Sequence, residues 1–220
     1  MKKLILVWCV VAAACDSPTV PERFLRDVYD FRLIMPTDTQ TLRWPVGAVV
    51  RLFVVNDPDA TRTQYLRAGV AHGVQAWNSA ALYGEVQLVQ TDRVDDADVV
   101  VQYTPATSPV DLGGCSPGGG AAYTTFCLTA DEEHLSVFPL TSGGTGRVKF
   151  VVTIRATAAT DAVNVRQLVS HELGHVIGIA RHSAKQTDLM YGGTLNRDAP
   201  SPADRATLQV LYHTSPDITP

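Results

Sequence analysis

The sequence predicts an α+β fold, an α/β sandwich in which helices pack against a sheet. Apolar runs rich in β-branched residues predict strands, and the clearest are Val49–Val55, Val99–Tyr103 and Arg147–Arg155. Between the first two runs, apolar residues recur at helical spacing. The chain has 220 residues, of which 45% are hydrophobic, so it has the length and composition of one globular domain with a core.

Shorter or less apolar runs predict the remaining strands. The complete set is Val49–Val55, Val86–Val89, Val99–Tyr103, Ala121–Leu128, Leu135–Leu140 and Arg147–Arg155. The run Val99–Tyr103 is almost entirely apolar, which suits a central strand covered on both faces. We expect Ala121–Leu128 and Leu135–Leu140 at the edges of the sheet, after a glycine-rich loop over residues 111–120.

Three helices are predicted from apolar spacing and from capping residues. The first is Arg62–Ala80, with Thr61 or Thr63 as its cap. Its apolar face consists of Leu66, Val70, Val74 and Trp77. Asn164 is expected to cap the second helix, whose sheet-facing residues are Val165, Leu168, Val169 and Val176. The last helix is expected to open at Pro200–Pro202.

The first residues predict export. Lys2 and Lys3 precede an apolar stretch, Leu4–Ala14, that is much shorter than the roughly 20 residues needed to span a bilayer. Small residues directly before Cys15 resemble a bacterial lipoprotein signal, which implies a signal peptide over residues 1–14 and a lipid anchor on Cys15. Ala12 stands where that pattern usually has leucine, so secretion without a lipid is the alternative. Residues 15–40 are interpreted as a tether that partly docks through an apolar cluster.

The remaining cysteines predict a disulfide. Cys9 is removed with the signal peptide, which leaves Cys115 and Cys127 around a glycine-rich loop. In an exported protein such a pair is most often bridged. The alternative is an inhibitory cysteine on a metal, as in the cysteine switch of animal matrix metalloproteases, but its Pro-Arg-Cys-Gly pattern is absent from this sequence.

The segment from His171 to Gly178 predicts a zinc site with a general base beside it. His171 and His175 are four residues apart, so on a helix they lie on one face and can reach one ion at about 2.0–2.1 Å. Glu172 leaves the helix about 100° around, where it can contact a water on that ion. Catalytic zinc takes three protein ligands and leaves one position open, so a third ligand is needed. Gly178 can end the helix and turn the chain back toward His182.

This segment resembles the metzincin peptidases, whose pattern is HExxHxxGxxH followed by a methionine turn. The third histidine of that pattern would stand at Arg181, but here it is His182. From His182 to Leu189-Met190-Tyr191 the spacing resembles the matrixin (matrix-metalloprotease-like) branch, so one inserted residue before His182 explains the difference. The resemblance extends from about Leu42 to Thr214.

The resemblance implies a zinc metalloendopeptidase domain over residues 41–214, followed by a tail over 215–220. It implies a twisted, mostly parallel sheet with an antiparallel edge strand, two long helices and a C-terminal helix after the methionine turn. His171, His175 and His182 would hold one zinc ion, Glu172 would be the general base, and Met190 would form the methionine turn. Asp204 resembles the acidic residue that ties the last helix to that turn.

The expected partner is an extended peptide or protein substrate, bound by a monomer. We interpret Asp131–His134 as a solvated loop, because the His-x-Asp pattern of the second zinc site of matrixins is missing. A calcium ion bound by this loop is the alternative, although no calcium motif indicates it. The net charge of −4 argues against a nucleic-acid partner. A membrane would be reached only through a lipid on Cys15, at a bacterial cell envelope, and the alternative is secretion.

Two other functions fit parts of the sequence. The displaced third histidine also fits a non-catalytic binding or adhesion lipoprotein that keeps the peptidase fold. A thermolysin-like peptidase would instead use a distant glutamate as the third ligand. Arg181 is interpreted as a solvent-facing insertion or a substrate contact.

Overall fold

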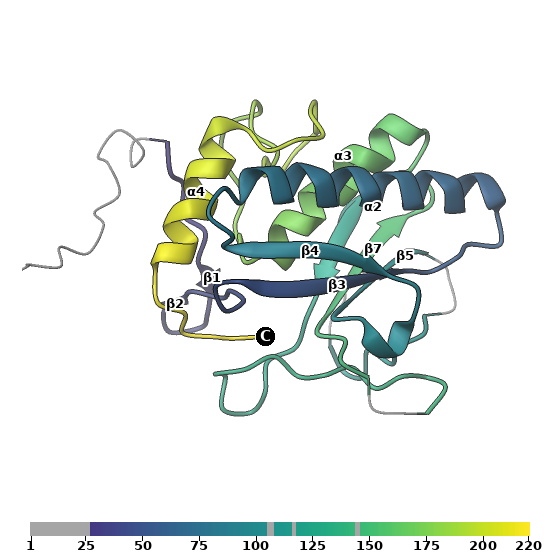
Figure 1. Ribbon diagram of the computed structural model, residues 1–220, viewed down its shortest axis with the longest axis horizontal. Coiled ribbons are helices and arrows are strands. Elements are labelled where there is room, and N and C mark those ends of the chain that lie inside the picture. Colours follow the sequence, from purple (N-terminus) through teal and green to yellow (C-terminus); the bar gives the residue numbers. More distant parts are fainter. Residues whose placement is uncertain (1–26, 105–107, 116–117, 144–145) are drawn as a thin grey trace, which may run out of the picture.

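The computed structural model describes residues 27–104, 108–115, 118–143 and 146–220. Cys15, Cys9 and the predicted signal peptide lie outside these ranges. Within these ranges the elements are two strands of a small hairpin, five strands of one sheet, three α-helices and a short 3₁₀ helix (Figure 1). In order they are β1 (Leu33–Ile34), β2 (Thr39–Gln40), β3 (Ala48–Val54), α2 (Ala60–Ala80), β4 (Val86–Thr91), η1 (Val94–Asp96), β5 (Val99–Thr104), β6 (Ala122–Thr125), β7 (Phe150–Arg155), α3 (Ala162–Val176) and α4 (Pro202–His213).

The main sheet has the strand order β4-β3-β5-β7-β6. All neighbours pair in parallel except β6, which pairs antiparallel to β7 at one edge. The predicted α+β class is therefore confirmed, with a mostly parallel sheet and an antiparallel edge strand. The apolar strand β5 is central, as predicted, and its residues Val99, Val100 and Val101 are fully buried.

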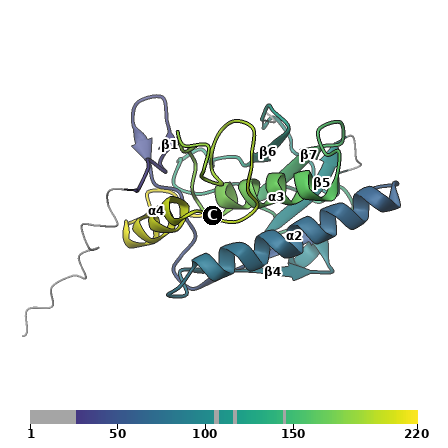
Figure 2. The same cartoon turned by 90° about the horizontal axis from the view of Figure 1, so that it is seen from above.

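Helices α2 and α3 lie side by side on one face of the sheet, while α4 lies at its end (Figures 1 and 2). Glycines on α2 permit the close approach of α2 and α3. A Cβ atom at Gly73 would lie 2.9 Å from Leu173 Cδ1, and one at Gly69 would lie 3.2 Å from Val165 Cγ1. The indole Nε1 of Trp77 then donates to the Ser170 carbonyl of α3 at 2.7 Å. The long first helix thus supports the helix that contains the histidine motif.

The other face of the sheet is covered by the irregular segments between β5 and β7. Val110, Phe138 and Leu140 from these segments pack against Val100 and Val151. The predicted strand Leu135–Leu140 is wrong: it forms only isolated bridges, to Leu128 and to Val110. Pro139 lies within this stretch and has no N–H to donate to a ladder. Leu135, Phe138 and Leu140 are buried all the same, as part of an irregular cover on the sheet.

Aspartates, rather than the predicted residues, cap the two long helices. The Asp59 side chain accepts from the N–H groups of Thr61 and Arg62, so α2 begins earlier than predicted. The Asp161 side chain accepts from the N–H of Asn164, which is therefore inside α3 and does not cap it. In both cases a carboxylate two or three residues upstream satisfies the free N–H groups of the first turn. Helix α4 opens at Pro202, as predicted, with Ser201 as its cap.

A disulfide joins Cys115 to Cys127, with 6.0 Å between their Cα atoms. The predicted pairing is therefore present. The bridge encloses both the glycine-rich loop and the edge strand β6 that follows it. Both cysteines pack against the apolar cluster that contains Val110, Phe138 and Val151.

Removing this disulfide should lower the free energy of unfolding by about 3 kcal/mol, the size expected for a loop of this length. Denaturant unfolding of the oxidised protein and of the Cys115→Ala/Cys127→Ala double variant measures the difference. The same midpoint for both proteins would show that the bridge does not stabilise the fold.

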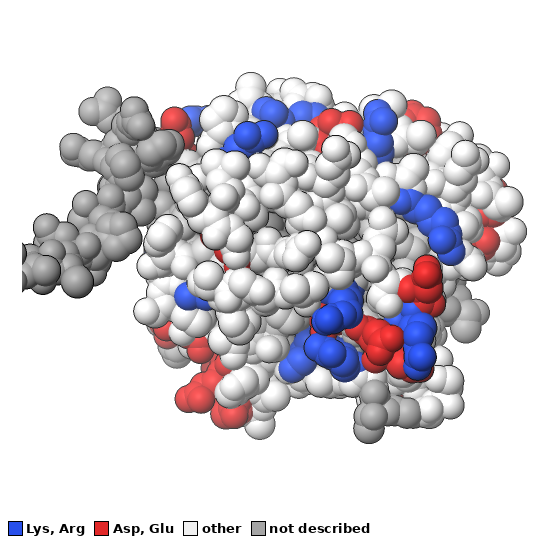
Figure 3. All heavy atoms as spheres, in the orientation of Figure 1, with Lys and Arg blue, Asp and Glu red and all other residues white. Residues whose placement is uncertain are grey.

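Charged side chains of both signs are interspersed on the face drawn in Figure 3. Some charged side chains of the described residues form exposed ion pairs, for example Arg93 with Asp95 and Asp96. Among the described residues, no helix is both long enough and apolar enough to cross a membrane.

Candidate metal centre

The histidine motif occupies the C-terminal half of α3. His171 and Glu172 are buried, at 6% and 4% exposed, while His175 is half-buried one turn further on. This half of the helix is held at its end by two long-range hydrogen bonds. Trp44 Nε1 donates to the Val176 carbonyl at 2.9 Å, and the Tyr212 hydroxyl donates to the Ile177 carbonyl at 3.1 Å. The free carbonyls of the helix end thereby find partners.

Gly178 ends α3 and reverses the chain, as predicted. Its φ is +112°, a conformation that residues with a side chain rarely adopt. The chain then returns beside the helix, and the Ser183 N–H donates to the Met190 carbonyl at 2.8 Å. His182 lies on this returning segment and is open to solvent.

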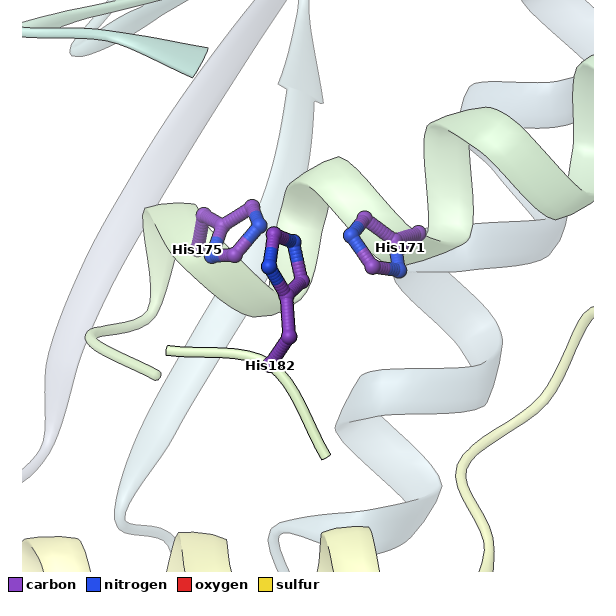
Figure 4. A group of neighbouring side chains, drawn as sticks. All are labelled: His171, His175 and His182. Carbon is purple, nitrogen blue, oxygen red and sulfur yellow. The ribbon is translucent and has the colours of Figure 1, made fainter. Parts of the chain in front are cut away.

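The three imidazoles converge on one point (Figure 4). The ring centroids of His171, His175 and His182 lie 5.0–5.1 Å apart, and one nitrogen from each lies within 4.8 Å of the other two. The structure thus brings together the three predicted ligands, including the displaced His182. Arg181 points away from this group and pairs with Asp30, with 2.7 Å between Nη1 and Oδ2.

Backbone carbonyls fix the orientation of two of these rings. His171 Nδ1 lies 2.7 Å from the Leu189 carbonyl, and His175 Nδ1 lies 2.7 Å from the Ile179 carbonyl. A carbonyl only accepts, so each Nδ1 is the protonated nitrogen and each Nε2 is free to bind a metal. Burial, together with repulsion from a neighbouring histidine, lowers the pKa of His171 and of His175 to about 4, so both are neutral at pH 7. Burial also lowers the pKa of His182, which favours its neutral form. Three neutral imidazoles beside a carboxylate fit a zinc ion.

Glu172 contacts the edge strand β6. The Thr124 hydroxyl donates to Glu172 Oε2 at 2.7 Å and lies 3.3 Å from the Glu172 carbonyl. Burial raises the pKa of Glu172, while the nearby His171 and the Thr124 hydrogen bond oppose that rise. No local pattern marks Thr124, because its partner is 48 residues away in the chain.

Met190 is fully buried against α3. A Cβ atom at Gly174 would clash with the Met190 Sδ, so the glycine of the motif lets the methionine pack against α3. The predicted role of Asp204 is present: its carboxylate accepts from the N–H of Leu189 at 2.8 Å and from that of Met190 at 3.3 Å. The same turn also orients His171, because the Leu189 carbonyl is the hydrogen-bond partner of His171 Nδ1.

Two cavities flank the convergent histidines. One, of about 210 Å³, is lined by Leu33, Leu42, Tyr123, Phe126 and His175 among others. The other, of about 150 Å³, is lined by Leu168, His171, Tyr191 and Leu195 among others. Glu172 and His182 border both. The candidate metal centre thus lies between two partly apolar pockets, beside edge strand β6.

The remaining histidines lie apart from this centre. His72 Nε2 lies 3.0 Å from the Asp198 carbonyl. His134 is exposed beside Asp131 and Glu133, and His213 is exposed at the end of α4.

Gly192 follows the methionine turn and packs against the His182 ring, where a Cβ atom would lie 3.0 Å from Cγ. A side chain at 192 would therefore press on the ring.

No family model and no curated protein matches the sequence. Among solved structures, two of myroilysin resemble the chain. The first aligns 88% of this chain with 96% of the other, at 12% identity and a TM-score of 0.43. The second aligns 66% of this chain with 48% of the other, at 16% identity and a TM-score of 0.35. At this level of similarity neither match assigns a family or an activity.

Proposed function

We propose that the protein is a zinc-dependent endopeptidase of the metzincin type, similar to the matrixins. The observation that supports it most is the convergence of three neutral imidazoles beside a buried carboxylate. His171, His175 and His182 would hold the ion, and Met190 would form the apolar floor. A zinc ion in such a site lowers the pKa of a water molecule and polarises a carbonyl oxygen.

Glu172 would be the general base. Its carboxylate would take a proton from the attacking water and pass it to the leaving nitrogen as the C–N bond breaks. The raised pKa of a buried carboxylate suits a group that must both accept and release a proton. The Thr124 hydroxyl would hold one carboxylate oxygen and leave the other free for this transfer.

The substrate would bind as an extended chain along β6. Among the described residues β6 has one hydrogen-bonded neighbour, β7, and a peptide strand could pair with its other edge. A chain in this position would pass Glu172 and place successive side chains toward the two flanking cavities. Internal peptide bonds, rather than terminal ones, would then be cleaved.

Incubation of the purified protein with an unfolded protein substrate tests this proposal. Mass spectrometry of the products should identify internal fragments with new termini on both sides of each cut. Intact substrate after prolonged incubation with the zinc-loaded protein would contradict it. Removal of residues from one end only would instead indicate an exopeptidase.

Thr124 provides a second test of the assigned base. Thr124→Val should lower kcat about tenfold with little change in KM, because a hydrogen bond to a charged group is lost. Thr124→Ser keeps the hydroxyl and should retain most of the activity. Steady-state kinetics of both variants measure kcat and KM. If the valine variant kept the kcat of the wild type, Thr124 would not position Glu172.

We also propose that the mature protein begins at Cys15 and is anchored by a lipid at that residue, in a bacterial cell envelope. The short apolar segment before Cys15 supports this, and the disulfide fits an exported protein. The wild type should partition into a detergent phase, and Cys15→Ala should not. A wholly soluble wild type with another N-terminal residue would mean secretion without a lipid.

A further inference from the structure

Residues 29–31 contact the loop that bears the third histidine. The Ala180 N–H donates to the Phe31 carbonyl at 2.8 Å. The Arg181 guanidinium pairs with the Asp30 carboxylate, with 2.7 Å between Nη1 and Oδ2. Both contacts involve the two residues immediately before His182. The N-terminal segment thus fixes the backbone from which the third imidazole projects.

The same short segment also contacts Asp204, which binds the backbone of the methionine turn. The Tyr29 hydroxyl donates to Asp204 Oδ1 at 2.6 Å, and its N–H donates to Thr207 Oγ1 at 3.3 Å. Asp204 in turn accepts from the Leu189 N–H, and the Leu189 carbonyl orients His171. Burial and the adjacent Asp204 raise the pKa of Tyr29 far above its ordinary value, so the phenol remains a donor.

The inserted residue, Arg181, contacts the N-terminal segment. Arg181 is the residue by which the spacing from Gly178 to His182 exceeds the metzincin pattern. In the structure its side chain meets Asp30, 151 residues earlier in the chain. Phe31 is buried in the core at 7% exposed, so the backbone between the two contacts is anchored. Leu33, two residues on, lines the larger cavity.

We propose that residues 29–31, the N-terminal clasp, are positioning residues of the metal centre. The clasp holds the Ala180–His182 loop and the methionine turn in the arrangement that presents three imidazoles to one ion. This rests on the proposed metal site and does not depend on peptidase activity. Its consequence is that the affinity for zinc depends on side chains that do not touch the ion.

Competition with a chromophoric chelator measures that affinity in the mature, full-length protein without an activity assay. Tyr29→Phe should weaken zinc binding about tenfold, the lower end of the effects seen when groups behind metal ligands are changed. Asp30→Ala and Arg181→Ala should each weaken it by about two- to fivefold, as expected for a half-exposed ion pair. The double variant should be no weaker than either single variant, because both remove the same contact.

Arg93→Ala is the matched control, because it removes an exposed ion pair with Asp96 away from the histidines. It should leave the affinity unchanged. Tyr29→Phe preserves the ring, and circular dichroism checks that each variant is folded. Wild-type affinity in Tyr29→Phe, Asp30→Ala and Arg181→Ala would overturn the clasp alone. Failure of the wild type to bind zinc would overturn the metal centre and the clasp together.

Discussion

Replacing Glu172 with alanine should lower the rate of peptide cleavage by about 10²–10⁴-fold, the usual contribution of a general base. Zinc binding should remain, because the imidazoles of His171 and His175 are oriented by the Leu189 and Ile179 carbonyls. Turnover and zinc content, measured on the same preparation, separate the two effects.

Glu172→Gln is the control for this variant. The amide keeps the size of the side chain, and its oxygen can still accept from Thr124, but it cannot take a proton. Both variants should therefore be equally inactive. Near-normal turnover in either one would contradict the assigned base, whereas loss of zinc from both would mean that the variants disrupt the site itself.

Replacing His182 with alanine should weaken zinc binding by more than about 100-fold, since even groups behind the ligands contribute 10–100-fold. The ring of His182 is within 5.1 Å of both other rings, measured between centroids, so its loss leaves two ligands. Cleavage should be lost with the metal. His213→Ala is the control, because His213 is exposed at the end of α4 and should not affect the affinity.

The His182 variant also distinguishes between the ligand sets that the sequence allows. Arginine at 181 is positively charged and offers no lone pair to a metal. A distant carboxylate, as in a thermolysin-like site, would leave zinc binding intact in His182→Ala. Wild-type affinity in that variant would therefore mean that the third ligand lies elsewhere.

Local patterns predicted the main elements well, because strands such as β5 and β7 are apolar runs whose burial is independent of their exact partners. The ends of the elements and the capping residues of the helices were predicted less well. Asp59 and Asp161 cap from outside the apolar pattern, and Leu135–Leu140 has the composition of a strand but pairs only at isolated bridges.

Local patterns likewise predicted only some of the residues of the candidate site. The spacing of His171 and His175 is a property of one helix turn, so it was visible in the sequence. Thr124 and Tyr29 were not predicted, because their partners lie 48 and 175 residues away and no local pattern marks them. Asp204 was found only through the resemblance to metzincins, which supplied a long-range contact that spacing alone could not.

Zinc content and its link to cleavage test the central proposal most directly. The purified protein should contain about one zinc ion per chain, as three convergent imidazoles imply. A chelator should abolish internal cleavage of an unfolded substrate, and added zinc should restore it. Cleavage that persists after all metal is removed would contradict the proposal, and zinc binding without any cleavage would favour a non-catalytic binding protein.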